Sequence, residues 1–191
     1  MVRLFVEAVS PIFACCDTLL TAQDVASASR FQNEGRRAEH LAWRRIVRRE
    51  LGRGVDIRYN DVGAPEVDTP NIYISVSHSR DVVVVAISDV AVGVDVERSD
   101  RNFEGVRSRI MDASEQSLSD DALWCAMTWC AKEAAYKLYG RRGIDLLDGI
   151  KLESYNRDTQ RVDVRIEGVA VAVDFDFSHS GYIVATAVYR S

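Results

Sequence analysis

The sequence predicts an α+β protein, a pseudo-dimer of two similar halves, each with a helix packed on a small, mainly antiparallel sheet. Three observations indicate this fold. A helical segment followed by strands occurs twice, the strands are short and rich in β-branched residues, and Ser-His-Ser stands at a strand edge in each half. The two copies, residues 77–79 and 178–180, lie far apart in the chain. We expect the division to fall between residues 1–98 and 99–191.

The first half begins with the segment "MVRLFVEAVSPIFACC", which predicts a buried strand rather than a signal peptide. A helix is expected over residues 33–51, "NEGRRAEHLAWRRIVRREL", because its apolar residues recur at helical spacing before Gly52 and Gly54. The segment "DVGAPEVDTP" predicts a loop. The runs "IYISVS", "VVVVAIS" and "VAVGVDVE" predict a three-stranded meander.

The second half repeats this order. A helix is expected over residues 121–139, "DALWCAMTWCAKEAAYKLY". Strands follow at "GIKLESY", "RVDVRIE", "VAVDFDF" and "YIVATAVY". Because no Pro- or Ser-rich linker separates the halves, we expect them to pack closely.

Composition limits the class of protein. The chain has 191 residues, 47% hydrophobic and 28% charged, which is typical of a globular protein with a real core. No apolar run reaches the roughly 18 residues of a membrane helix. The four cysteines lack metal-finger spacing, and adjacent Cys15 and Cys16 make a poor disulfide pair, so reduced thiols in a cytoplasm are expected.

Charge is unevenly distributed. The net charge of −5 argues against general nucleic-acid binding. Between Arg30 and Arg58, however, nine arginines stand against four acids. This basic stretch is either a solvated helix face or a site for a phosphate-bearing ligand, which needs converging cationic donors.

The strand "VGVDVE" carries a pair of acids on one face. Side chains alternate along a strand, so Asp95 and Glu97 point together while Val94 and Val96 point the other way. Their Cα atoms are about 7 Å apart, which suits oxygen ligation of one Mg²⁺. The alternative is a solvent-facing acid pair. No such strand follows the second Ser-His-Ser, so His179 lacks the partners of His78.

The helix stretch "WCAKEAAYK" places Trp129, Glu133 and Lys137 on one stripe, at i, i+4 and i+8, with Lys132 beside them. The chain has three lysines against 21 arginines, and two of the three stand here. Lysine at these positions indicates a need for a compact point charge, or for a pKa that can move. The alternative is a surface Glu–Lys pair.

The stretches "SVSHS", "GVDVE" and "WCAKEAAYK", in this order, resemble the signatures of the phosphopantetheinyl transferases, N-x-S-H-S, G-x-D-x-E and W-x-x-K-E-A-x-x-K. The resemblance is to the larger monomeric type, which activates surfactin synthetase, and with the preceding basic helix it covers residues 30–137. That family is an internal pseudo-dimer. The resemblance therefore makes the first Ser-His-Ser the functional copy and the second a structural echo.

The resemblance implies a cytoplasmic, monomeric enzyme that transfers 4'-phosphopantetheine from coenzyme A, the co-substrate, to a serine of an apo carrier protein. The carrier is of acyl, polyketide or peptidyl type, and adenosine 3',5'-bisphosphate is released. Coenzyme A would lie in the cleft between the halves. The implied cofactor is Mg²⁺, or Mn²⁺, and neither nucleic acid nor membrane is an expected partner. The alternatives are another Mg²⁺-dependent nucleotide phosphoryl-transfer enzyme and a non-catalytic homologue that binds coenzyme A or a carrier.

The resemblance also implies roles for individual residues. Glu133 would act as the base for the serine proton, directly or through a metal-bound water, while Lys132 would contact a phosphate or pair with an acid. The implied metal ligands are Asp95, Glu97 and Glu133, the catalytic residues are Glu133, Lys137 and His78, and the coenzyme A contacts are Arg30, Arg36, Arg37, His40, Ser77, His78, Lys132 and Lys137.

Two positions depart from the family pattern. Ala64 stands where the family has the lysine of Gly-Lys-Pro, which assists a phosphate, and Arg58 is a candidate to compensate. Ser75 replaces the usual Asn before Ser-His-Ser.

Overall fold

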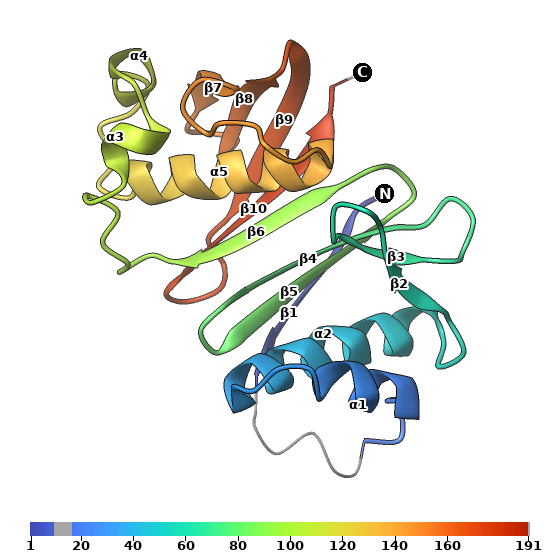
Figure 1. Ribbon diagram of the computed structural model, residues 1–191. Coiled ribbons are helices and arrows are strands. Elements are labelled where there is room, and N and C mark those ends of the chain that lie inside the picture. The colour runs from blue at the N-terminus through green and yellow to red at the C-terminus, as the bar shows by residue number, and fades with distance from the viewer. Residues whose placement is uncertain (10–16, 191) are drawn as a thin grey trace.

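The protein has four layers, helix, sheet, sheet and helix, in a computed structural model that describes residues 1–9 and 17–190 (Figure 1). The α+β class expected from the sequence is confirmed, since both main sheets are antiparallel.

Cys15 and Cys16 lie outside the described residues. Cys125 and Cys130 are buried free thiols. No helix in the described ranges is long and apolar enough to cross a membrane.

The N-terminal half is a three-stranded sheet of order β1-β5-β4 whose outer face is covered by α2, with α1 against α2 (Figure 1). The predicted helix is confirmed, and so is a strand near the N-terminus, but β1 is a half-buried edge strand and not the buried strand expected. The helix begins after Asn33, whose side chain accepts from the Arg36 amide, and ends at Gly52, where φ is 101°. The elements are β1 (Arg3–Ala8), α1 (Ala22–Ala28), α2 (Glu34–Leu51), β4 (Tyr73–Ser79) and β5 (Val82–Ser88).

A small hairpin packs against β4 of this sheet. It consists of β2 (Ile57–Tyr59) and β3 (Pro65–Val67), which pair antiparallel. The prediction of an unbroken loop over residues 61–70 is therefore wrong at β3. Pro65 and Gly63 mark a turn, but they did not reveal the short strand that follows it.

The C-terminal half is a five-stranded sheet of order β6-β10-β9-β8-β7, and α5 packs on its outer face (Figure 1). The predicted second helix and the four strands after it are confirmed, with the helix starting three residues later than expected. The elements are β6 (Gly93–Arg98), α3 (Arg107–Ile110), α4 (Ala113–Gln116), α5 (Trp124–Tyr139), β7 (Ile150–Asn156), β8 (Arg161–Ile166), β9 (Val169–Asp176) and β10 (Tyr182–Tyr189).

The predicted meander is correct for β4 and β5 but wrong for β6. This strand pairs with β10 and is bonded into the second sheet. The β-branched pattern did not reveal this, because a strand buries alternate residues equally well beside a neighbour or in a facing sheet. The expected boundary at residue 98 stays a prediction. β6 ends at this boundary, but β10, the strand to which it is hydrogen-bonded, lies beyond it.

The two sheets face each other across an apolar layer. Central strand β5 is buried on both faces. Its Val83, Val85 and Ile87 pack toward α2. The alternate residues Val82, Val84 and Ala86 join Val94, Val96 and Val184 of the other sheet in one buried cluster. The expected close packing of the halves is confirmed, and it brings the edge strands β4 and β6 side by side.

Candidate active site

The edges of the two sheets are joined by serine side chains. Ser75, Ser77 and Ser79 alternate along β4, so all three point toward β6. Two of them donate to the acids that the sequence singled out. The hydrogen bonds join the Val94 amide to Ser75 Oγ at 3.0 Å, Ser77 Oγ to Asp95 Oδ1 at 2.7 Å, and Ser79 Oγ to Glu97 Oε2 at 3.0 Å.

Helix α5 lies unusually close to β6. A Cβ atom at Gly93 would collide with backbone atoms of Ala134 and Leu138, so only glycine allows this approach. The approach places Lys137 over the strand. Its Nζ donates to Asp95 Oδ1 at 2.8 Å and to the Val94 carbonyl at 3.0 Å.

Glu133, one turn before Lys137, completes a group of three carboxylates with Asp95 and Glu97. Burial raises the pKa of Glu133, and the charges of Asp95 and Glu97 raise it further against the opposing effect of Lys137. Burial also raises the pKa of Glu97, although Arg101 and Ser79 oppose that shift. The group concentrates more negative charge than Lys137 alone can balance.

The donor set suits a hard divalent cation. Asp95 Oδ2 is buried and has no hydrogen-bond partner. A carboxylate oxygen left in this state is costly unless a cation or donor meets it. Among the described residues no three acidic, His or Cys side chains stand ready to hold a metal together. Glu97 is turned to Ser79 and to Arg101, which forms an ion pair with it. Ligation by all three carboxylates therefore requires rotation of side chains.

His78 lies on the other face of β4, toward α2. Arg36 Nη1 is 2.7 Å from His78 Nε2 and 3.1 Å from Glu39 Oε2. Burial lowers the pKa of His78, and the cations Arg36 and Lys137 lower it further against the opposing effect of Glu39. The imidazole is therefore neutral near pH 7, and Arg36 is the charged group of this pair.

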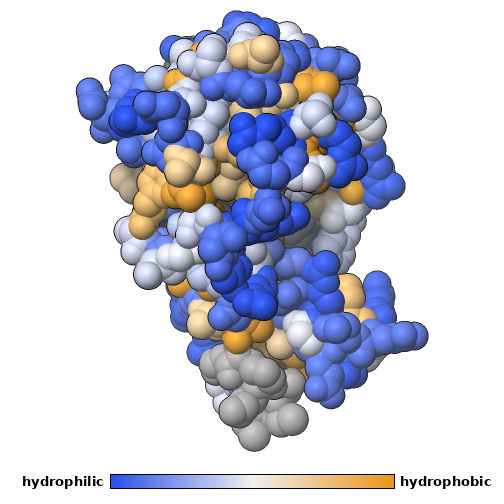
Figure 2. Space-filling view, turned by 90° about the vertical axis from the view of Figure 1, so that its left-hand side faces the viewer, coloured by the Kyte–Doolittle hydropathy of each residue, from blue (hydrophilic) through white to orange (hydrophobic). Residues whose placement is uncertain are grey.

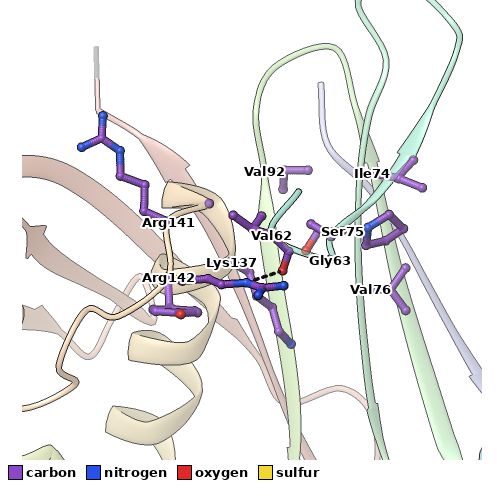
Figure 3. A pocket seen from close by; sticks show the side chains of 13 residues that line it. Val62, Gly63, Ile74, Ser75, Val76, Val92, Lys137, Arg141 and Arg142 are labelled. Carbon is purple, nitrogen blue, oxygen red and sulfur yellow. Dashed lines mark hydrogen bonds between the residues drawn. The ribbon is translucent and has the colours of Figure 1, made fainter. Parts of the chain in front are cut away.

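Two adjoining cavities lie along the cleft. One, of about 190 Å³, lies under Arg36 and His78 and is lined by four rings, those of Phe31, His40, Trp43 and Tyr59. The next, of about 240 Å³, shares Pro65 and Val76 with it and reaches Lys137 (Figure 3). Together they offer aromatic and apolar walls beside cationic groups.

Several predicted contacts lie away from this arrangement. Lys132 is fully buried, 2.7 Å from Glu115 Oε1, and donates to the Leu146 carbonyl at 2.8 Å. It therefore pairs with an acid inside the second half, which was one of the two roles expected. It does not reach the cleft, and its expected contact with coenzyme A is not supported.

His40 and the remaining arginines have different surroundings. His40 lines the aromatic cavity, but its Nε2 is 2.7 Å from Ser27 Oγ, and burial lowers its pKa to about 4, so it carries no charge for a phosphate. Arg37 is half-buried and pairs with Glu34 at 3.8 Å. Arg30 is exposed just after α1. Neither lines the two cavities.

Sequence reasoning missed Arg101 and the joint role of the serines. Arg101 pairs with Glu97 and stacks on Phe103 and Trp129, with its Cζ 4.7 Å and 5.4 Å from the ring centroids. No sequence signal marks this contact, which depends on the loop after β6. The serines were visible as an alternating set, since Ser75, Ser77 and Ser79 share one strand face.

The fold and the site together define a class: an α+β protein in which buried Asp95, two half-buried glutamates and half-buried Lys137 lie beside a cleft lined with cations suited to phosphate. Residues 91–187, about half of the chain, match the 4'-phosphopantetheinyl transferase superfamily. The chain belongs to that superfamily, and it is a transferase enzyme. No curated protein matches the sequence.

Proposed function

We propose that this enzyme transfers 4'-phosphopantetheine from coenzyme A to a serine hydroxyl of an apo carrier protein and releases adenosine 3',5'-bisphosphate. The observation that carries the proposal is the meeting of Asp95, Glu133 and Lys137 beside the cleft that also receives Arg36 and His78. Three acids suit a Mg²⁺ ion, and the basic groups suit the phosphates of coenzyme A.

The residues divide the chemistry among them. Mg²⁺ bound by Asp95, Glu97 and Glu133 would neutralise negative charge on the pyrophosphate. The Lys137 ammonium stabilises charge that develops on the leaving phosphate. Glu133 would accept the proton of the attacking serine, either directly or through an intervening water.

Arg36 and His78 bind and orient the phosphate end of coenzyme A. Arg36 is an always-charged donor, and the neutral imidazole of His78 can donate through one nitrogen. The aromatic cavity beside them offers apolar walls for the flat adenine ring. Ser77 holds Asp95 in place rather than meeting the ligand, because its hydroxyl already donates to that carboxylate.

We also propose a subtype and an internal duplication for this enzyme. We assign the chain to the larger monomeric type and interpret the two halves, residues 1–98 and 99–191, as copies of one α+β unit. In support, each of the two main antiparallel sheets has a helix on its outer face, although β6, from within residues 1–98, belongs to the second sheet (Figure 1). Ser-His-Ser precedes a turn into the next strand in both halves.

The carrier would approach a surface of mixed character. Figure 2 shows one face of the molecule, on which hydrophilic residues predominate and apolar residues gather in small patches between them. The chain is acidic overall, with a net charge of −5. Docking of an acidic carrier would therefore depend on local basic and apolar contacts rather than on net attraction.

The deciding experiment is mass spectrometry of apo carrier proteins of fatty-acid, polyketide and peptide type, each incubated with the enzyme, coenzyme A and Mg²⁺. We expect at least one carrier to gain the mass of phosphopantetheine, and omission of Mg²⁺ to abolish the gain. If every carrier keeps its apo mass while the enzyme releases phosphate or pyrophosphate from nucleotides, the reaction is another phosphoryl transfer.

A further inference from the structure

The cavity of about 240 Å³ between the halves has an uneven charge distribution (Figure 3). The N-terminal half contributes mainly apolar or small residues, among them Val62, Gly63 and Ala64. The C-terminal half contributes three cations, Lys137, Arg141 and Arg142. None of the residues that line the cavity is acidic. A cavity with three cations and no carboxylate is suited to an anionic ligand.

Arg142 reaches across the cleft. Its Nε donates to the carbonyl of Val62 at 3.2 Å, and a Cβ built on Gly63 would lie 3.5 Å from its Nη2 (Figure 3). The Arg142 side chain points across the cleft because the chain turns at the end of α5. There Gly140 adopts the left-handed conformation, with φ of 68°, and directs the chain toward the opposite half. Arg141 points away from Val62 in the same view and packs over the ring of Tyr139.

The Arg142 guanidinium makes no ion pair with any described residue. Asp145 and Asp148 line a separate open hollow with Arg142 but form no salt bridge with it. Asp145 instead accepts from the amides of Leu147 and Asp148. In contrast, Lys137 already pairs with Asp95. Arg142 is therefore the cation of the cavity whose side chain crosses the cleft with its charge uncommitted.

Ala64, on the facing wall, supplies no charge at the position where the family resemblance expects a lysine. Arg58, the sequence-based candidate to compensate, is 3.1 Å from Asp56, has a side chain that is 65% exposed, and does not line the cavity. Arg142 lies beside Gly63 instead and comes from the other half. Ala64 and Arg142 line the same cavity from opposite sides.

We infer that Arg142 is a substrate-binding residue that holds a phosphate group of coenzyme A from across the cleft, in place of the lysine missing at position 64. The inference rests on the proposed function. A planar guanidinium offers two parallel donors to a phosphate, so the contact with Val62 leaves the Nη atoms available. Binding at this point would also tie the substrate to both halves.

The test measures coenzyme A affinity by calorimetry and the KM for coenzyme A by carrier modification, in wild type and in variants. We expect Arg142→Ala and Arg142→Gln each to raise Kd and KM on the order of 10-fold or more, as loss of a charge-assisted hydrogen bond implies. Arg142→Gln keeps a donor for the Val62 carbonyl but loses the charge. Ala64→Lys added to Arg142→Ala should restore most of the affinity, and Arg58→Ala should leave it unchanged.

A second arm uses 3'-dephospho-coenzyme A. If the Arg142 variants and wild type bind it equally, Arg142 holds the 3'-phosphate, and if the loss persists, it holds the pyrophosphate. Arg142→Gln with wild-type affinity for both compounds would overturn the inference and leave only a contact between halves. Failure of wild type to modify any carrier would instead count against the proposed function, and the calorimetric comparison would still decide the role of Arg142.

Discussion

The Cβ position of Gly93 coincides with the space taken by the carbonyl oxygen of Ala134. This overlap means that β6 and α5 touch backbone to backbone. Their separation sets how near Glu133 and Lys137 lie to Asp95, because the first two project from the helix and the third from the strand. A glycine that contacts no ligand thereby determines the geometry of the site.

Gly93→Ala should therefore damage both stability and activity. Forcing one methyl group between the two backbones costs about 1–3 kcal/mol of unfolding free energy, and the displaced helix would carry Lys137 away from Asp95. Urea unfolding and transfer rate are the measurements. Gly105→Ala is the matched control, since nothing lies within 4 Å of its Cβ position. A Gly93→Ala enzyme as stable and active as the control would show that the helix can shift freely.

Lys132→Met tests the buried pair with Glu115. Both side chains are fully buried, so the change leaves an uncompensated carboxylate and should cost about 3–5 kcal/mol. Lys151→Met is the control, because that lysine is 38% exposed in its pair with Asp112 and should cost at most about 1 kcal/mol. Loss of coenzyme A binding at unchanged stability in Lys132→Met would return this residue to the ligand site.

His40 predicts a pH dependence of stability. Its pKa is about 4 in the fold against 6.5 when unfolded, so the unfolded chain binds a proton first as the pH falls below 6.5. Folding is therefore weakened between pH 6.5 and 4, by about 1.4 kcal/mol per pH unit at most. From pH 7 to pH 5 the unfolding free energy of wild type should fall by roughly 2 kcal/mol more than that of His40→Gln. A His40→Gln variant with the wild-type slope would show that His40 does not cause this dependence.

The two histidines of the repeated tripeptide should differ in importance. His78 contacts Arg36 at the cleft, whereas His179 lies 3.6 Å from Asp176 in the turn before β10. His78→Ala should raise the KM for coenzyme A on the order of 10-fold, and His179→Ala should change neither KM nor kcat by more than about twofold. Steady-state kinetics against coenzyme A would decide, and a worse defect in the His179 variant would reverse the assignment of functional copy and echo.

Asp95→Asn should lower the transfer rate on the order of 10²–10³-fold or more, because it removes charge from the proposed metal site but keeps the shape of the side chain. Calorimetry with Mg²⁺ alone should show weaker binding. Asp100→Asn, an exposed acid paired with Arg98 just beyond the strand, is the control. Retention of Mg²⁺ affinity and turnover within a few-fold of wild type would remove Asp95 from the site.

The sequence predicted the main elements because their signals are local. Asn33 and Gly52 bound α2, and alternating or continuous apolar runs marked the strands. Helix α1 was missed because "AQDVASA" has little apolar periodicity, although Thr21 and Asp24 form a capping box that could have revealed it. The membership of β6 in the second sheet is set by tertiary packing, and no local pattern reports it.

In the candidate site, too, the sequence predicted what local spacing determines and not what tertiary packing determines. Glu133 and Lys137 share a helix stripe, and the structure brings both to Asp95 as spacing indicated. Lys132 stands one residue from Glu133, about 100° around the helix, so it faces the core rather than the cleft. Arg142 could not be found from sequence, because its importance comes from a contact between residues 80 positions apart.

Strand β10 lies between β6 and β9, and this order has a consequence for synthesis of the protein. During translation Asp95 and Glu97 emerge long before Tyr182–Tyr189, the only strand that pairs with β6 among the described residues. At typical elongation rates the interval is roughly 4–17 s. During this interval the acidic strand lacks its backbone partner, and of the contacts described above the serines of β4 are those that precede it in the chain.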